Sequence, residues 1–239
     1  MRFSHIAGIV VCTTAAFISI APIQVEAATF KVESGVTSID RDHENILRNI
    51  GLIITGSENT VLPIPSDYLV GFQIDSATNF TFSDEGGFTP LFGTIEHSGT
   101  VTFNDQITVG NFSIGFAPGR TVPNASGLVL RDTISALNPI LFDLSYPQSV
   151  TFDKQNLTLT LADVQLFISP EFAQGLGDSN LAGLFAGTAR IDAQVAAVPE
   201  PGSALAILAA GAAFLAARFS TFRIQNSGVR IQELEDLDT

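Results

Sequence analysis

The sequence predicts an all-β protein: an antiparallel β-sandwich of jelly-roll-like arrangement with one or two short helices, plus an apolar helix near the C-terminus. Three observations support this fold class. Short stretches rich in β-branched and aromatic residues alternate apolar with polar side chains, a period that places the apolar residues on one face of a strand. Polar or glycine-rich clusters separate these stretches. The long helical crossovers that a parallel sheet needs are absent between them.

Eight segments carry the strand pattern. In chain order they are NIGLIITG (49–56), YLVGFQI (68–74), NFTFS (79–83), GTVTFNDQITVGNFSIGF (99–116), SGLVLRD (126–132), PILFDLS (139–145), SVTFDKQNLTLTLADVQLFIS (149–169) and GTARIDAQVAAV (187–198). The segment 99–116 divides into three short strands. We expect one sandwich from about Thr29 to Val195. Its predicted buried residues are Phe103, Ile114, Phe116, Leu159, Ile191 and Val195.

Two short helical pieces interrupt the strands. One is predicted to begin at Ser169, because serine is a good N-cap, Pro170 fits the first turn, and Glu171 lies near the positive end of the helix dipole. A second helical piece is predicted after Asp178, in SNLAGLFAG (179–187).

The charge of the chain restricts its partners. The net charge is −13 at pH 7, and residues 28–198 contain seven Lys or Arg against eighteen Asp or Glu. Nucleic acid and anionic lipid are bound chiefly through Lys and Arg, so we expect no nucleic-acid partner. The negative surface serves solubility, and attraction of divalent cations is the alternative.

The N-terminus has the pattern of a signal peptide, which we assign to residues 1–27. Arg2 supplies a positive charge, an apolar stretch follows, and small side chains precede a cleavage site between Ala27 and Ala28. A retained N-terminal anchor is the alternative. The single cysteine, Cys12, lies inside this segment, so the mature chain has no thiol for catalysis or metal binding.

Motifs of enzymes are missing from the mature chain. Only His43 and His97 remain after removal of the signal peptide. HENIL at His43 lacks the second histidine of a zinc-binding HExxH pair, and there is no phosphate-binding glycine loop. We therefore predict a protein that is not an enzyme and has no cofactor. A hydrolase whose site assembles from distant residues remains a third hypothesis.

Binding of calcium or sugar is the main alternative to a purely structural role. DRDHEN (40–45) begins like a calcium loop but lacks the glycine and glutamate of an EF-hand, so a looser site there, or at Asp84 and Glu85, stays open. Sugar-binding sites favour Trp and Tyr, and this chain has no Trp and only Tyr68 and Tyr146. Exposure of either tyrosine in a groove would favour sugar binding.

The C-terminal stretch VPEPGSALAILAAGAAFLAARFSTFR (198–223) has three parts. Pro199, Glu200 and Pro201 form an extended, non-helical segment, because proline fixes its own backbone and restricts the residue before it. Residues 203–217 are apolar or small and would form a short membrane helix of about 22 Å. Arg218 and Arg223 then mark the cytoplasmic side.

This order of Pro-Glu-Pro, apolar helix and arginines resembles the PEP-CTERM sorting signal. The resemblance implies export in a Gram-negative bacterium that makes exopolysaccharide, recognition of Pro199, Glu200 and Pro201 by a membrane-embedded exosortase, and Arg218 and Arg223 as stop-transfer residues. Family tails end soon after the basic cluster, whereas sixteen residues follow Arg223 here.

The sequence therefore predicts four regions: a signal peptide (1–27), a β-sandwich domain (28–198), a sorting signal with a short transmembrane helix (199–223) and a cytoplasmic tail (224–239). The predicted role is that of an exported, non-enzymatic surface or matrix protein, anchored transiently in the inner membrane. Its predicted partners are signal peptidase, an exosortase-type enzyme and exopolysaccharide. A secreted module that binds polysaccharide or calcium is the alternative.

Overall fold

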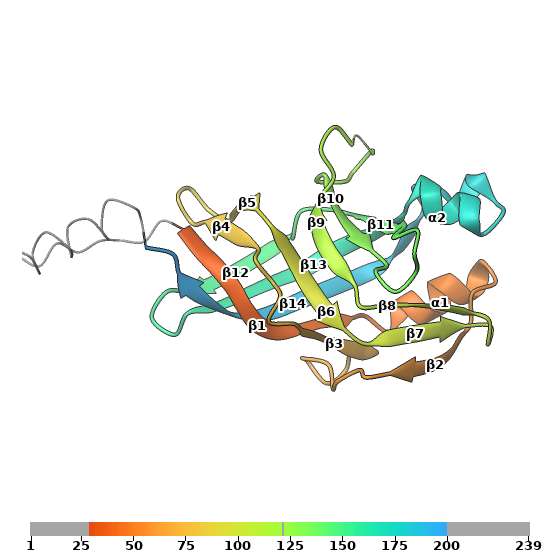
Figure 1. The fold of residues 1–239 in the computed structure, drawn as a ribbon, viewed down its shortest axis with the longest axis horizontal. Helices are drawn as coiled ribbons and strands as arrows, with labels where there is room; N and C mark the ends of the chain where they lie inside the picture. The colour runs from red at the N-terminus through yellow and green to blue at the C-terminus, as the bar shows by residue number, and fades with distance from the viewer. Residues whose placement is uncertain (1–28, 121, 200–239) are drawn as a thin grey trace, which may run out of the picture.

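The computed structural model describes residues 29–120 and 122–199, which form a β-rich domain (Figure 1). Its strands are β1 (Thr29–Ile39), β2 (Ile54–Glu58), β3 (Val70–Ile74), β4 (Thr81–Ser83), β5 (Thr89–Phe92), β6 (Thr94–Ser98), β7 (Thr100–Phe103), β8 (Ile107–Gly110), β9 (Ser113–Phe116), β10 (Leu128–Arg131), β11 (Ile140–Leu144), β12 (Ser149–Asp153), β13 (Thr158–Ile168) and β14 (Phe185–Ala197). Its helical elements are α1 (Asp42–Asn49), α2 (Pro170–Gly175) and the 3₁₀ turn η1 (Ser179–Leu181).

The main sheet closes on itself through β14. Seven strands follow one another in the order β13-β11-β10-β9-β6-β3-β1, and β14 pairs with both β1 and β13. Every pairing between named strands is antiparallel. The result is a closed ring of antiparallel strands, a barrel- or sandwich-like fold that confirms the predicted all-β antiparallel class.

The long strands β1 and β13 continue beyond the ring at one end, where each pairs with a further strand. The first residues of β1 pair with β4 and its last residues pair with β3. The β1–β14 register shifts between Val32 and Ser34, where β1 passes from one partner to the other. Strand β13 pairs in the same manner with β12 and then with β11.

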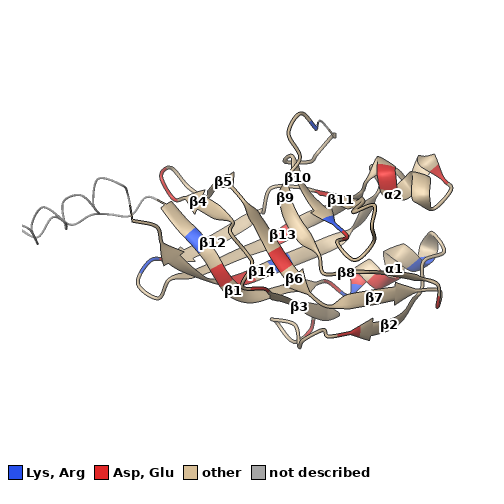
Figure 2. Cartoon of the chain, viewed as in Figure 1, with Lys and Arg blue, Asp and Glu red and all other residues tan. Residues whose placement is uncertain are grey.

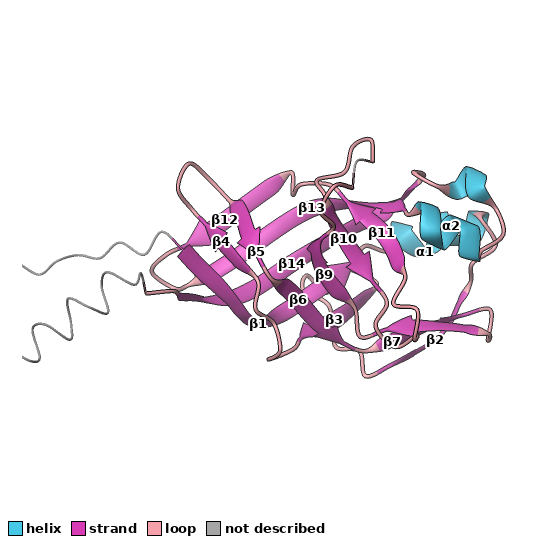
Figure 3. Ribbon diagram, turned by 45° about the horizontal axis from the view of Figure 1, so that its top comes forward, coloured by secondary structure: helices cyan, strands magenta, loops and turns pink. Residues whose placement is uncertain are grey.

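The opposite end of the ring carries a cap. Strands β2, β7 and β8 form a separate three-stranded sheet, and α1 and α2 lie beside it (Figures 1 and 3). Helix α1 contacts β14, and α2 contacts β11. Leu47 of α1 and Phe172 of α2 are buried and join the main hydrophobic core.

Most of the predicted core is confirmed. The buried residues are Phe103, Ile114, Leu159, Ile191 and Val195. The prediction for Phe116 is wrong, because this side chain is 38 % exposed. Strand β9 ends at Phe116, and the chain leaves the sheet there. Phe116 therefore lies at the end of the strand, where its side chain is less covered than that of Ile114.

The structure also tests the two predicted helical pieces. The Ser169 hydroxyl accepts a hydrogen bond of 2.9 Å from the backbone N–H of Phe172, and Pro170 begins α2, as predicted. The second piece is only partly helical. Asp178 caps η1, but the turn ends at Leu181 and Phe185 already begins β14.

Several elements differ from the sequence prediction. The strand predicted at 49–56 begins only at Ile54, because α1 continues to Asn49. Helix α1 includes most of DRDHEN (40–45), the segment considered for a loose calcium site, and its inward side chains His43 and Leu47 are buried. Strands β1, β5 and β6 were not among the predicted segments.

The remaining sequence predictions concern segments outside the described residues. These are the signal peptide with Ala27 and Ala28, and the tail with Glu200, Pro201, the apolar stretch 203–217, Arg218 and Arg223. Within residues 29–120 and 122–199, no helix is long and apolar enough to cross a membrane.

Candidate functional site

The two ends of the domain lie side by side. Phe30 of β1 pairs with Ala197 of β14, and the backbone N–H of Val198 donates a 2.9 Å hydrogen bond to the carbonyl of Thr29. Figure 1 shows the start of β1 and the end of β14 at the end of the domain opposite α1 and α2. Pro199, the first residue of the predicted sorting motif, is exposed next to this pair.

A polar groove of about 490 Å³ crosses the outer face of the ring. It is lined by Asp75, Ala77, Asn79, Thr94, Glu96, His97, Ser98, Asn111 and Thr133. Asp75 and Glu96 face each other across neighbouring chain segments, since the Asp75 N–H donates a 2.7 Å hydrogen bond to the Glu96 carbonyl. Opposed residues of an antiparallel pair point their side chains to the same face, so both carboxylates border the groove.

Hydrogen bonds hold the groove side chains in place. The Asp75 carboxylate accepts from the Ala77 N–H at 2.8 Å and from the Ser98 hydroxyl at 3.2 Å, and these bonds lower the pKa of Asp75. Asn79 Oδ1 accepts from the Thr94 N–H at 2.7 Å, and Asn111 Oδ1 accepts from the Gly99 N–H at 3.2 Å.

The hydrogen bonds within the groove leave some donors and acceptors of its side chains free to bind a ligand. Within the described part of the chain, the NH₂ groups of Asn79 and Asn111 have no intramolecular acceptor. Glu96 uses Oε1 to accept from the Ser113 hydroxyl at 2.8 Å. No Lys or Arg is among the residues that line the groove. Figure 2 shows a band of acidic colour on β6. The groove therefore offers hydrogen bonds and negative charge, which suits a polar ligand that is neutral or cationic.

His97 lies between this groove and an inner cavity of about 50 Å³. Its Nδ1–H donates to the Phe112 carbonyl at 2.9 Å, which leaves Nε2 to accept from the Thr37 hydroxyl at 2.7 Å. Both ring nitrogens are thus occupied. Burial disfavours the charged imidazolium and lowers the pKa of His97 to about 4.

His43 borders the same cavity from α1. Its Nδ1–H donates to the Ala186 carbonyl, and its ring meets Phe142 edge-on with 5.7 Å between ring centres. Burial lowers the pKa of His43 as well. Among the described residues, neither His43 nor His97 hydrogen-bonds to a carboxylate. The Ser/His/acid arrangement that the hydrolase hypothesis requires is therefore not assembled at either described histidine.

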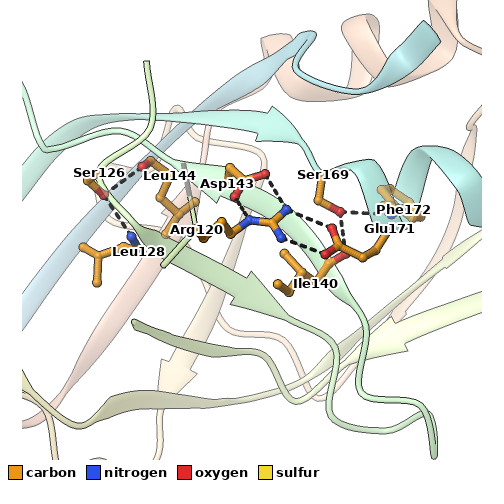
Figure 4. A network of polar contacts seen from close by, with 9 residues as sticks. All are labelled: Arg120, Ser126, Leu128, Ile140, Asp143, Leu144, Ser169, Glu171 and Phe172. Atoms are coloured by element: carbon orange, nitrogen blue, oxygen red, sulfur yellow. Dashed lines mark hydrogen bonds and ion pairs between the residues drawn. The ribbon is translucent and has the colours of Figure 1, made fainter. Parts of the chain in front are cut away.

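An ion-pair network fastens the loop between β9 and β10 to the cap (Figure 4). Arg120 in this loop binds Asp143 of β11 through both Nε and Nη2, the latter at 2.9 Å. The same guanidinium donates to Glu171 of α2 at 2.7 and 2.8 Å. Asp143 is buried, and these bonds raise the pKa of Arg120 and lower that of Glu171.

The other candidate residues do not converge on a site. Asp42 and Glu44 lie on α1, and Glu44 pairs with Arg48 at 2.8 Å. Residues 29–120 and 122–199 contain no group of three or more His, Cys, Asp or Glu side chains arranged to hold a metal ion. Tyr146 is exposed and Tyr68 is half-buried, but neither lines the groove or the inner cavity.

The sequence analysis missed the groove and the Arg120 network. A signal for Asp143 was present, because a carboxylate inside the apolar run PILFDLS needs a buried cation or hydrogen bonds. Asp75 and Glu96 are twenty-one positions apart in the sequence, and only the pairing of their chain segments brings them together.

No protein-family model matches the chain, and no curated protein matches it. Among solved structures, the C-terminal domain of HtaA from Corynebacterium glutamicum is similar, with a TM-score of 0.44 and 12 % sequence identity. The match covers 70 % of this chain and 99 % of that domain.

Replacing Arg120 by Met is expected to lower the free energy of unfolding by about 3 kcal/mol, because Asp143 would be left buried and charged without its partner. Chemical denaturation of the full chain measures this change. The matched control is Arg48→Met, which removes an exposed pair on α1 and should cost about 0.5 kcal/mol or less. Equal losses in the two variants would contradict the structural role of Arg120.

Stability is expected to fall as the pH is lowered from about 6.5 towards 4. The pKa of His97 is about 4 in the folded state against an ordinary 6.5, so the unfolded chain binds more protons in this window. The contribution of the neutral histidines to the free energy of unfolding is fully present above pH 6.5. Below that pH it falls by up to about 1.4 kcal/mol per pH unit for each buried histidine. His43 acts in the same direction.

Urea denaturation between pH 7.5 and 5 measures this slope before most carboxylates titrate. His97→Gln is the control, since its amide can donate to the Phe112 carbonyl and accept from the Thr37 hydroxyl without titrating. A smaller slope is expected for this variant. A wild-type stability that is constant over the window would refute the neutral, buried state of both imidazoles.

Proposed function

We propose that this chain is an exported, non-enzymatic β-module of the cell surface or extracellular matrix, delivered by exosortase-type sorting of its C-terminus. The signal peptide (1–27) would direct export and be cleaved between Ala27 and Ala28. The apolar stretch 203–217 would hold the chain in the inner membrane until it is processed near Pro199, Glu200 and Pro201.

One observation carries this proposal. Strand β1 begins at Thr29, immediately after the predicted signal-peptide cleavage site, and β14 ends at Ala197, immediately before the sorting motif. The main sheet between these two points closes into a ring only with both strands. Cleavage at the two predicted positions would therefore remove both addressing segments and leave every strand of the ring intact.

The arrangement of the ends also suits attachment to a membrane. Since both ends leave the ring at one place, a chain held through residues 203–217 would direct the capped end with α1 and α2 away from the bilayer. The extended Pro-Glu-Pro segment would keep its peptide bonds accessible to a protease at the membrane surface. Arg218 and Arg223 would stay on the cytoplasmic side.

Replacing Pro199, Glu200 and Pro201 by alanine is expected to trap the protein as a membrane-bound precursor, because the helix could then extend through the segment that the protease reads. Fractionation of cells with pulse labelling measures the rate of release. The control replaces Gln225, Asn226 and Ser227, three residues of the tail beyond Arg223. Release of the Pro-Glu-Pro variant at the wild-type rate would reject the sorting proposal.

The outer groove favours a second candidate function, which is binding of a neutral or amino-group-containing polysaccharide. Amide NH₂ groups and carboxylate oxygens at fixed positions match the acceptors and donors of sugar hydroxyls. An ammonium group of the ligand would reduce the repulsion between the opposed carboxylates of Asp75 and Glu96. The absence of Lys and Arg from the lining disfavours sulfated or uronic glycans.

Glu96→Gln is expected to weaken binding of a glucosamine hexasaccharide about tenfold, because it removes the charge and keeps the bond to Ser113. Calorimetry measures the affinity, with the N-acetylated hexasaccharide as the uncharged comparison. Glu58→Gln, at an exposed position on β2, is the control. No binding, or equal binding by Glu96→Gln and wild type, would exclude this role for the groove.

A further inference from the structure

The interior cavity is a separate feature from the outer groove. It lies between the ring and the cap, and its wall is almost entirely apolar. The residues that line it are Thr37, Ile39, His43, Ile54, Leu69, Val70, Phe72, His97, Val101, Phe103, Val109, Phe112, Leu130, Leu141, Phe142, Leu166 and Phe172. The polar side chains of this wall are those of Thr37, His43 and His97.

His43 contributes a free hydrogen-bond acceptor to this wall. The side chain is only 7 % exposed, and its one hydrogen bond runs from Nδ1 to the Ala186 carbonyl. Nε2 therefore carries a lone pair that no described group uses. Among the fully enclosed side-chain nitrogen and oxygen atoms of the described residues, only Ser135 Oγ lacks a partner, so His43 Nε2 keeps some surface that a water-sized molecule reaches, and His43 is one of the residues that line the cavity.

The surroundings of His43 fix this orientation. Gly187 leaves room for the imidazole, because a Cβ at that position would lie 2.9 Å from His43 Cβ and 3.0 Å from Nδ1. Its φ of +129° is a further reason for glycine there. The bond to Ala186 selects the tautomer with the proton on Nδ1, and Phe142 packs against the ring. The acceptor is thus held in one position before any ligand arrives.

Water does not match this cavity well. A buried water needs two to four polar partners, and apolar cavities stay dry. His97 uses both ring nitrogens, and Thr37 donates its hydroxyl proton to His97. The wall therefore offers a ligand two acceptors, the Thr37 hydroxyl oxygen and His43 Nε2, and no free donor. A molecule with one donor and an otherwise apolar surface satisfies both parts of the wall.

We propose that the interior cavity is a binding site for a small, uncharged aliphatic alcohol, whose hydroxyl donates to His43 Nε2 and whose carbon atoms contact the apolar wall. The volume of about 50 Å³ sets the size. Since one water requires about 10–15 Å³ of such space, the cavity takes about three or four non-hydrogen atoms, the size of ethanol or propanol. The low pKa of His43 keeps Nε2 an acceptor at neutral pH.

Nitrogen NMR of the full chain labelled with ¹⁵N-histidine tests this site. Ethanol and 1-propanol are expected to shift the His43 Nε2 resonance and to give contacts from their methyl groups to the Phe142 ring. His97 serves as an internal comparison, because both of its nitrogens are already bonded and should shift less than His43 Nε2. Chloroethane has the same size without a donor and should bind about fivefold or more weakly.

His43→Phe is the matched variant, since it keeps the ring and removes the acceptor. Loss of the alcohol contacts in this variant supports the proposal. If the variant does not fold, the comparison of ethanol with chloroethane on the wild-type chain decides alone. Equal binding of the two ligands would show an apolar cavity without a role for His43. A His43 Nε2 resonance that is already hydrogen-bonded to water and does not respond to alcohol would show a hydration site. Either result overturns the proposal.

Discussion

The pairing of β14 with both β1 and β13 is the constraint on which the rest of the structure depends. Without β14, the other seven strands form an open sheet whose two ends, β1 and β13, have free edges. Closure brings Phe30 next to Ala197 and so places the two ends of the domain together. The same strand supplies the Ala186 carbonyl that orients His43 and the Gly187 position that makes room for it. The paired ends of the domain, the cavity and the position of α1 thus all depend on one strand near the end of the domain.

Polar groups are divided between the two sides of the ring. Carboxylates and amides collect in the outer groove, where solvent and hydrogen bonds stabilise their charge. The wall of the inner cavity has only Thr37, His43 and His97 among its apolar side chains, and burial holds both imidazoles neutral. The buried carboxylate of Asp143 is matched by the guanidinium of Arg120.

Much of the fold could be predicted from the sequence, because alternation of apolar side chains reports a half-buried strand directly. Ser169 and Pro170 likewise located the start of α2. Strand β1 was missed because glycine and polar residues, including Gly35, interrupt its alternation where the strand bulges and changes partner. Helix α1 was missed because the acidic residues of its first turn resembled a loop, and only His43 and Leu47 face inward. The groove could not be predicted, since strand pairing and not sequence spacing brings its residues together.

Measuring the intact mass of the protein recovered from its native cell surface would show whether both ends are processed as proposed. The account predicts a chain that begins at Ala28 and ends close to Pro199, Glu200 and Pro201, so that β1 and β14 are complete and residues 203–217 are absent. A released chain that retains the apolar stretch, or one that ends within β14, would contradict the account.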